Sequence, residues 1–254
     1  MEVTHKEKLT QAERKVKRPK TMPDAAEIYE ACASSNSGSA EGLLLCLTQS
    51  LLQESTADRE YIQRNHEYSR NMNVVVCAAL AFFMQAGFAM VCAGAVRKKN
   101  LQNTMLKNLL DACGAVMAFY SVGYAFAFGD GSDPNGFIGT TNFFLQGVDD
   151  VAFWLYQFAF SAASATIVAG TLAERCQMSA YFYYSIMLSG LVYPITVHAI
   201  WGRYGFLSGA IEKPLFGVGV LDIAGGCVVH ITGGSTALIA TWVSALSIVV
   251  LVAK

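Results

Sequence analysis

Residues 221–234, LDIAGGCVVHITGG, combine a long apolar run with two ionisable side chains, Asp222 and His230. An ionisable group inside a membrane span is costly, and such groups usually face a bundle interior or a water-filled path. Gly226, His230 and Gly234 recur at every fourth position and form one stripe on a helix, which Asp222 begins. Glycines beside an imidazole leave room for a neighbouring helix or a narrow lumen. The spacing therefore predicts a polar stripe that faces a bundle or a pore.

Two aromatic residues in neighbouring apolar runs, Phe160 and Trp201, extend the chemistry that this stripe could perform. An indole and a phenyl ring attract a small cation by roughly 0.5–2 kcal/mol, depending on its desolvation. Asp222 would add a counter-charge, and a neutral imidazole at His230 could accept or relay a proton. The residue types favour a small protonatable cation or a proton relay over sodium or potassium. Ordinary structural roles remain open for each residue, such as an interfacial belt position for Trp201 or an interhelical hydrogen bond for His230.

The composition indicates that these residues lie in a membrane protein. Hydrophobic residues make up 54% of the 254-residue chain and charged residues only 15%, whereas a soluble domain carries about a quarter charged residues. The mean hydropathy is +0.38. The formal net charge of −1 gives no basic surface for nucleic acid.

Uncharged stretches long enough to span a bilayer, which takes roughly 20 helical residues, predict five transmembrane helices in an all-α polytopic bundle. These stretches cover 71–96, 112–129, 151–173, 176–202 and 223–253. A helical bundle of this kind would position Phe160, Trp201 and His230 on neighbouring spans.

The first 70 residues are polar, and we expect a loosely ordered tail there, followed by a membrane domain over 71–254. The apolar segment 42–52 is too short to span a bilayer and is expected to form a surface helix or a disordered patch. The basic start of the chain precedes no apolar core, so it does not read as a secretory signal peptide. The seven cysteines show no CxxC or CxxH spacing and predict neither a disulfide framework nor a metal site.

The distribution of charge between spans predicts the orientation. Arg97, Lys98 and Lys99 follow the first span, and the loop 130–150 holds four Asp and no Lys or Arg. The positive-inside rule then places 97–107 inside and the N-terminus outside. In this orientation Trp201 ends its span at the outer surface. From the helical rise of about 1.5 Å per residue, Asp222, Phe160 and His230 lie roughly 6, 13 and 18 Å deep in a ~30 Å core.

Five motifs, in the same order along the chain, resemble the ammonium transporter family, in particular its eukaryotic plant-type branch. They are FFMQAGFAMVCAGAVRKKN (82–100), NLLDACGAVMAFYSVGYAFAFG (108–129), FWLYQFAFSAASATIVAGTLAER (153–175), YPITVHAIWGRYG (193–205) and LDIAGGCVVHITGGSTAL (221–238). The resemblance covers about 73–243. It implies a trimeric membrane transporter of eleven helices with no cofactor and no enzymatic activity, an outside N-terminus and one substrate pathway in each subunit.

The resemblance also implies roles for individual residues. Phe160 becomes an outer aromatic gate, Trp201 the external cation site, and Asp222 a buried acid that supports recruitment and deprotonation of ammonium. His230 becomes the first of two facing pore histidines, and Gln157 lines the vestibule beside Phe160. The glycines of the stripe then line the pore.

The family is built as an inverted repeat with the pathway between its halves, and this chain is expected to hold only the first half. The second histidine and a complete pathway are then expected outside it. Two other functions stay open. The chain could be a nonconducting truncated subunit that joins full-length transporters, or His198 and His230 could be axial ligands of a haem. We expect a multi-pass protein of the plasma membrane whose partners are ammonium, lipid and either its own copies in a homotrimer or full-length subunits.

Overall fold

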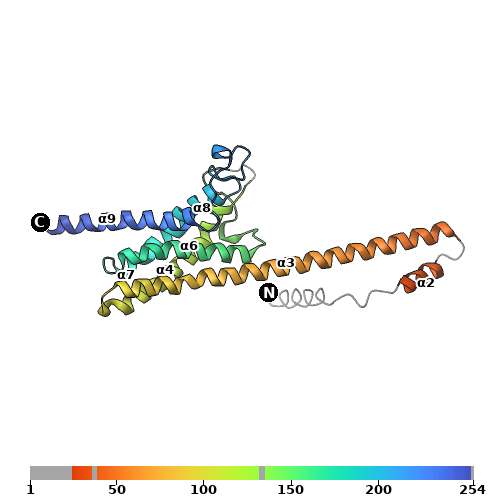
Figure 1. The fold of residues 1–254 in the computed structure, drawn as a ribbon, viewed down its shortest axis with the longest axis horizontal. Coiled ribbons are helices and arrows are strands. Elements are labelled where there is room, and N and C mark those ends of the chain that lie inside the picture. Colours follow the sequence, from red (N-terminus) through yellow and green to blue (C-terminus); the bar gives the residue numbers. More distant parts are fainter. Residues whose placement is uncertain (1–24, 36–38, 132–134, 253–254) are drawn as a thin grey trace. The chain divides into compact units, whose positions relative to one another are not determined.

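The computed structural model describes residues 25–35, 39–131 and 135–252. The described elements are helices, and the extended pairing in this part of the chain is one isolated bridge between Ser208 and Val220. The predicted all-α fold is confirmed (Figure 1). The chain divides into two compact units, Met1–Tyr68 and Ser69–Lys254.

Five helices in the described residues are long and apolar enough to cross a membrane, as predicted. They cover Ala40–Ala95, Lys98–Phe128, Val151–Leu172, Met178–Trp201 and Gly226–Ala245. The second of them begins 14 residues earlier than the predicted stretch 112–129, because helix formation tolerates the polar residues of 98–111. The predicted stretch thus omitted Lys107 and Asp111, which lie on the helix α4 (Leu101–Ala118) of this span.

The expectation of a loosely ordered tail differs from the structure over residues 25–35 and 39–70, which are largely helical; residues 1–24 and 36–38 lie outside the described residues. Helix α2 covers Ala25–Ser35, and helix α3 covers Ala40–Ala95. The apolar segment 42–52 is part of α3. No Gly or Pro interrupts residues 43–86, and Gln, Glu, Arg and Leu are good helix formers. The charged residues of α3 therefore interrupt its hydrophobic sequence but do not interrupt the helix.

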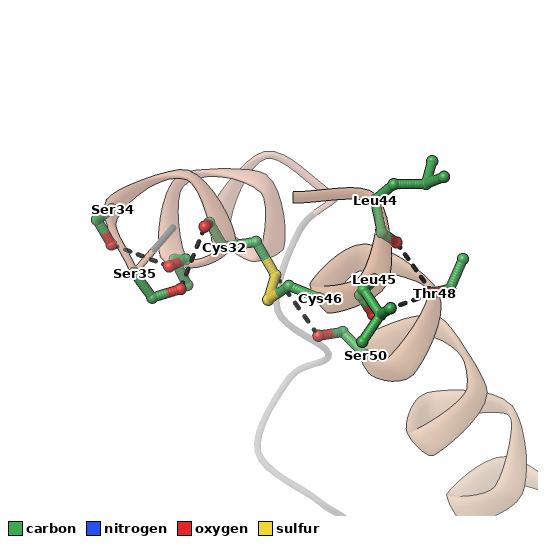
Figure 2. Close-up of a disulfide and its surroundings, with 9 residues drawn as sticks. Cys32, Ser34, Ser35, Leu44, Leu45, Cys46, Thr48 and Ser50 are labelled. Carbon is green, nitrogen blue, oxygen red and sulfur yellow. Dashed lines mark hydrogen bonds between the residues drawn. A yellow bond between two sulfur atoms is a disulfide. The ribbon is translucent and has the colours of Figure 1, made fainter. Parts of the chain in front are cut away.

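A disulfide between Cys32 and Cys46 joins α2 to the first turns of α3 (Figure 2). Their Cα atoms lie 5.7 Å apart. The prediction from cysteine spacing was wrong here. A separation of 14 residues matches no short motif, and the pair forms because α2 and α3 fold back on each other. Ser39 directly precedes α3, and its hydroxyl accepts a hydrogen bond from the amide of Gly42 at 3.4 Å.

In the unit Ser69–Lys254, π-helical segments interrupt three of the spans. Helix α4 (Leu101–Ala118) continues through η2 (Phe119–Gly123) into α5 (Tyr124–Phe128). Helix α7 (Met178–Met187) continues through η4 (Leu188–Val192) into α8 (Tyr193–Trp201). The last span begins with η6 (Gly226–Ile231) and continues as α9 (Thr232–Val252). Helix α6 (Val151–Leu172) is α-helical throughout.

Small residues form much of the core between these spans. Ala115, Ala162 and Ala163 are at most 1% exposed and pack with the large side chains of Phe119 and Tyr193. Helix α6 lies against α4 and α9, and α4 also packs against α7. Small side chains allow helices in a membrane to approach closely, which replaces the missing hydrophobic driving force with van der Waals contact.

The two π-helical segments η2 and η4 pack against each other. A Cβ atom on Gly123 would lie 2.5 Å from the carbonyl oxygen of Ser189, and one on Gly190 would lie 3.3 Å from Cβ of Ala118. Pro194 is the second residue of α8, just after η4, and cannot donate a helical hydrogen bond, which favours a π-helical turn before it. The glycines therefore set the distance between the second and fourth spans.

Glu174 ties together two loops on one side of the bundle. Its Oε1 atom accepts hydrogen bonds from the backbone amide and Nε of Arg97 and from Nδ2 of Asn100, at 2.9, 3.2 and 2.8 Å. These donors, the Arg97 amide first, lower the pKa of the Glu174 carboxyl to about 2. The loop after the first span is thereby joined to the loop after the third.

We predict that Gly123→Ala lowers the free energy of unfolding by about 1–3 kcal/mol, the usual range for overpacking, because the new Cβ would collide with the Ser189 carbonyl. Thermal unfolding of the purified chain in detergent measures the effect. Gly87→Ala on α3 is the matched control, since nothing lies within 4 Å of its Cβ position. Equal unfolding temperatures for the two variants would contradict the proposed close contact between η2 and η4.

Candidate functional site

Asp222 lies four residues ahead of the first residue of η6 and caps the start of that helix. Its Oδ1 accepts a hydrogen bond from the amide of Gly226 at 2.7 Å. Its Oδ2 accepts from the amides of Cys227 and Val228 at 2.9 and 2.8 Å. The first amides of a helix have no partner within it, and their dipoles favour a negative charge. Asp222 therefore holds a carboxylate in a site built from backbone donors.

The sequence-based placement of Asp222 on the helical stripe was wrong, because the helix begins only at Gly226. Gly225 adopts a left-handed conformation with φ +83°, and its carbonyl accepts from the amides of both Val229 and His230 at 3.0 Å. A Cβ on Gly225 would lie 2.7 Å from Cγ2 of Val229. Glycine is the residue that tolerates this conformation and this contact.

The remaining members of the stripe do share one face. Gly226, His230 and Gly234 are exposed, whereas Val229 and Gly233, on the other side, are buried. A Cβ on Gly234 would meet nothing within 4 Å. The face with the imidazole thus points away from the described part of the bundle.

Phe160, Trp201 and Asp222 come together from three separate segments. The Trp201 indole, at the end of α8, donates its Nε1–H to the backbone carbonyl of Asp222 at 2.6 Å. The Phe160 ring on α6 lies 6.0 Å from the Trp201 ring, with an interplanar angle of 71°. Tyr156 packs on the other side of Phe160 at 4.9 Å. Both Phe160 and Trp201 are partly exposed, so a cation could reach an aromatic face here while the Asp222 charge lies close by.

Gln157 and Tyr193 place further polar atoms in the core near this group. Gln157 lies on α6 one turn before Phe160 and is 6% exposed; Tyr193 is fully buried. Within the described residues, neither Gln157 Oε1 nor the Tyr193 hydroxyl has a hydrogen-bond partner. Unsatisfied polar atoms are rare in a packed core and often indicate a bound water, an ion or a functional role.

His198, one of the two proposed haem ligands, is not available to bind iron in the structure. His198 is 1% exposed, and both ring nitrogens face carbonyl oxygens, Nδ1 that of Ala127 at 3.0 Å and Nε2 that of Asn135 at 2.7 Å. Neither nitrogen is free to bind a haem iron. In the described part of the chain, no three or more His, Cys, Asp or Glu residues come together in a group that could hold a metal ion.

Residues 72–248 match the model of a protein family described as Ammonium Transporter Family. Ammonium transporter 1 member 3 of Solanum lycopersicum is 47% identical over 161 residues, which cover 62% of this chain and 34% of that protein. Ammonium transporter 3 of Dictyostelium discoideum is 39% identical over 189 residues, covering 72% and 42%. This chain thus spans about a third to two fifths of the length of these curated relatives.

Solved structures with the same helical arrangement include a sensor Amt protein and Mep2 of Candida albicans. The sensor protein has a TM-score of 0.58 and 30% identity over 66% of this chain and 42% of its own. Mep2 has a TM-score of 0.56 and 29% identity over 66% of this chain and 37% of its own. The fold shared with them is that of the membrane spans.

We predict that Asp222→Ala lowers the free energy of unfolding by about 2 kcal/mol or more, because hydrogen bonds to a charged group contribute about 1.5–3 kcal/mol and three amides lose their acceptor. Asp222→Asn keeps one acceptor oxygen without the charge and should give an intermediate value. Thermal unfolding in detergent measures the series, with the exposed Asp149→Asn as control. If all three variants unfold like the parent chain, Asp222 does not stabilise the start of η6.

Proposed function

The chain belongs to the ammonium transporter family, and from this premise we propose that it forms part of a pathway that carries ammonium, as ammonia and a proton, across the membrane. The observation that carries the proposal is the group formed by Phe160, Trp201 and Asp222, where two aromatic rings lie beside a helix-capping carboxylate. Ammonium is a small protonatable cation, the class of substrate that this chemistry suits.

Recognition begins at the rings. Ammonium approaches the exposed part of the Trp201 and Phe160 rings, where the negative face of each ring attracts it. Both oxygens of Asp222 are already held by backbone amides, so Asp222 acts at a distance. It supplies the counter-charge and fixes Trp201 through its own carbonyl. Gln157 Oε1, which has no partner in the described residues, offers a further acceptor for an N–H group.

Selectivity follows from the loss of charge before the centre of the bilayer. A bare charge there costs at least about 2.5–3.5 kcal/mol, whereas ammonia is neutral and potassium has no neutral form. In the proposed mechanism the ammonium loses its proton near the Asp222 group, and ammonia passes along the face that carries Gly226, His230 and Gly234. The imidazole of His230 accepts or relays the proton.

The exposed face of η6 and α9 supports the proposal that another surface completes the pathway. His230 is exposed in this chain, and so are large apolar residues of the same span, namely Ile231, Leu238, Ile239 and Trp242. A stripe that includes an imidazole would be poorly satisfied by lipid. We propose that the covering surface carries the second histidine, and that the assembled subunits form a homotrimer.

The same exposed face favours a second candidate function. A chain with this face uncovered could associate with full-length subunits and inhibit them, without conducting ammonium itself. Loss of transport by a full-length relative on co-expression would support this function.

We further propose that the protein lies in the plasma membrane with its N-terminus outside. The disulfide between Cys32 and Cys46 supports an outside location for this region, because disulfides persist in oxidising compartments and are rare in the cytosol. Arg97, Lys98 and Lys99, which follow the first span, support an inside location for the next loop.

A chimaera tests the proposed function. Residues 72–248 of this chain replace the corresponding segment of the tomato transporter, which is expressed in yeast that lacks its own ammonium transporters. We expect growth on limiting ammonium. His230→Ala in the chimaera should lower ammonium uptake by about tenfold or more, since a positioned proton-transfer group contributes on the order of 10²-fold in enzymes.

Ser235→Ala, also on the exposed face one turn further on, is the matched control and should leave uptake unchanged. Surface expression is measured for every variant. A chimaera that reaches the surface and carries no ammonium refutes the proposed function, and full uptake by the His230→Ala variant removes His230 from the pathway. The 254-residue chain by itself should not restore growth; restored growth that His230→Ala abolishes would mean that copies of this chain build the pathway between them.

Thiol labelling tests the proposed orientation. A membrane-impermeant maleimide should label Asp149→Cys in intact cells and Lys98→Cys only after permeabilisation, since both positions are exposed and lie on opposite sides of the membrane in the proposal. The parent chain controls for its own cysteines. Labelling of Lys98→Cys in intact cells would reverse the orientation.

A further inference from the structure

A second carboxyl lies inside the membrane-spanning bundle, away from the Asp222 group. Asp111 belongs to α4 and is fully buried at 0% exposure. The two salt bridges found in the described residues, Arg70–Asp150 and Arg97–Glu174, do not include it. A charged carboxylate in this position would have no salt bridge, which is a costly arrangement in a medium of low dielectric constant.

The nearest basic side chain on the same helix is engaged elsewhere. Lys107 Nζ donates hydrogen bonds to the carbonyls of Ala173 and Cys176 at 2.9 and 2.8 Å, and it lies 4.4 Å from the centre of the Tyr181 ring. An ammonium group has three donors, and here they satisfy the carbonyls that follow α6 and face an aromatic ring. Lys107 therefore binds the backbone carbonyls just after α6 and forms no salt bridge with Asp111.

The contacts of the Tyr184 hydroxyl bear on whether the Asp111 carboxyl carries a proton. The Tyr184 hydroxyl on α7 lies 2.9 Å from Oδ2 of Asp111 and 3.0 Å from the carbonyl oxygen of Ala165 on α6. A hydroxyl has one proton and can donate to only one of these two acceptors. Both contacts are hydrogen bonds if Asp111 itself carries a proton on Oδ2, donates it to the Tyr184 oxygen, and leaves the Tyr184 proton for Ala165.

We propose that Asp111 is an intramembrane proton-binding site, in which a neutral carboxylic acid donates to Tyr184 and Tyr184 donates to the carbonyl of Ala165. These two hydrogen bonds, from Asp111 to Tyr184 and from Tyr184 to Ala165, run in the same donor-to-acceptor direction and join α4, α7 and α6. A third link runs from the Ser185 hydroxyl to the backbone carbonyl of Asp111 at 2.6 Å. Loss of the proton would break the directed chain and leave a bare charge between three spans.

The other groups around Asp111 fit a neutral acid. The titratable side chains that face it are Lys107 on its own helix, Tyr181 and Tyr184 on α7, and Cys92 on α3. Apart from Lys107, none of them is a cation. The second oxygen, Oδ1, has no hydrogen-bond partner in the described residues, and an unpartnered carbonyl oxygen costs far less than an unpartnered carboxylate oxygen. Asp111 thus contrasts with Asp222, whose two oxygens receive three amide hydrogen bonds.

Infrared spectroscopy of the purified chain in lipid nanodiscs tests the proposal without any transport assay. A protonated carboxylic acid has a C=O stretching band, separate from the bands of ionised carboxylates. We expect this band at neutral pH in the parent chain and its loss in Asp111→Asn. It should persist in the matched control Asp149→Asn, which changes an exposed carboxyl outside the spans. Absence of the band from the parent chain, or its persistence in Asp111→Asn, would overturn the proposal.

Tyr184→Phe gives a second test that keeps Asp111 in place. Without its acceptor, the acid proton loses its hydrogen bond, and the C=O band should shift to higher frequency. A band that does not move means that Asp111 does not donate to Tyr184. Asn at position 111 can also donate to the Tyr184 oxygen, so Asp111→Asn should unfold close to the parent temperature and Tyr184→Phe below it. The reverse order would mean that the Tyr184 hydroxyl contributes less to stability than the acid of Asp111, and would also contradict the proposal.

Discussion

Three consecutive amides at the start of η6 require an acceptor, and the carboxylate of Asp222 meets this requirement. Several features follow from that single interaction. The backbone must turn sharply before the helix so that the carboxylate can fold over its end, which Gly225 permits through its positive φ. The turn directs the Asp222 carbonyl toward Trp201, whose indole it fixes. The aromatic group at the site is thus positioned by the backbone chemistry of a helix terminus.

The same constraint, that polar groups in a bilayer must find partners within the protein, is met differently at the other polar positions. Lys107 satisfies carbonyls beyond the end of α6, just as Asp222 satisfies amides at the start of η6. Glu174 joins two loops through three donors. Asp222, Lys107 and Glu174 thus compensate backbone groups or join neighbouring loops. Asp111 and His230 follow neither pattern, because one lies deep in the core and the other on an exposed face.

Hydropathy alone predicted the five spans and the helical class. A chain that crosses a bilayer needs long apolar segments, and the α-helix satisfies the hydrogen bonds of its backbone there. The helix starts were less predictable. Polar residues extend α3 and α4 well beyond their apolar stretches, so a count of uncharged residues placed the second span after Asp111 and missed it. Its apolar setting, NLLDACG, was the available signal. The disulfide between Cys32 and Cys46 could not be predicted, because it forms between two helices, α2 and α3, whose approach no local sequence pattern indicates.

For the site, the structure brings Phe160, Trp201 and Asp222 together, whereas the sequence ordered them by depth and could not place Asp222 outside the helix. A strict spacing of four residues assumes an α-helix, and η6 is π-helical and preceded by a left-handed glycine. The exposure of His230 also could not be predicted, because which side of a uniformly apolar helix faces the bundle depends on its neighbours.

The π-helical turn η2 has a consequence for how this bundle can change over time. A π-helical turn holds one residue more than the α-helix it interrupts, so η2 behaves as a one-residue insertion that the span has absorbed. Deleting one residue there would restore a regular α-helix and leave α5 facing as it does now. An added residue within the regular helix α4 would instead rotate α5 by about 100°, and Tyr124 and Ala127, which are buried in the core, would turn toward lipid. Length variation among relatives is therefore expected to avoid the regular helical stretches and to be tolerated at this turn and in loops such as 203–220.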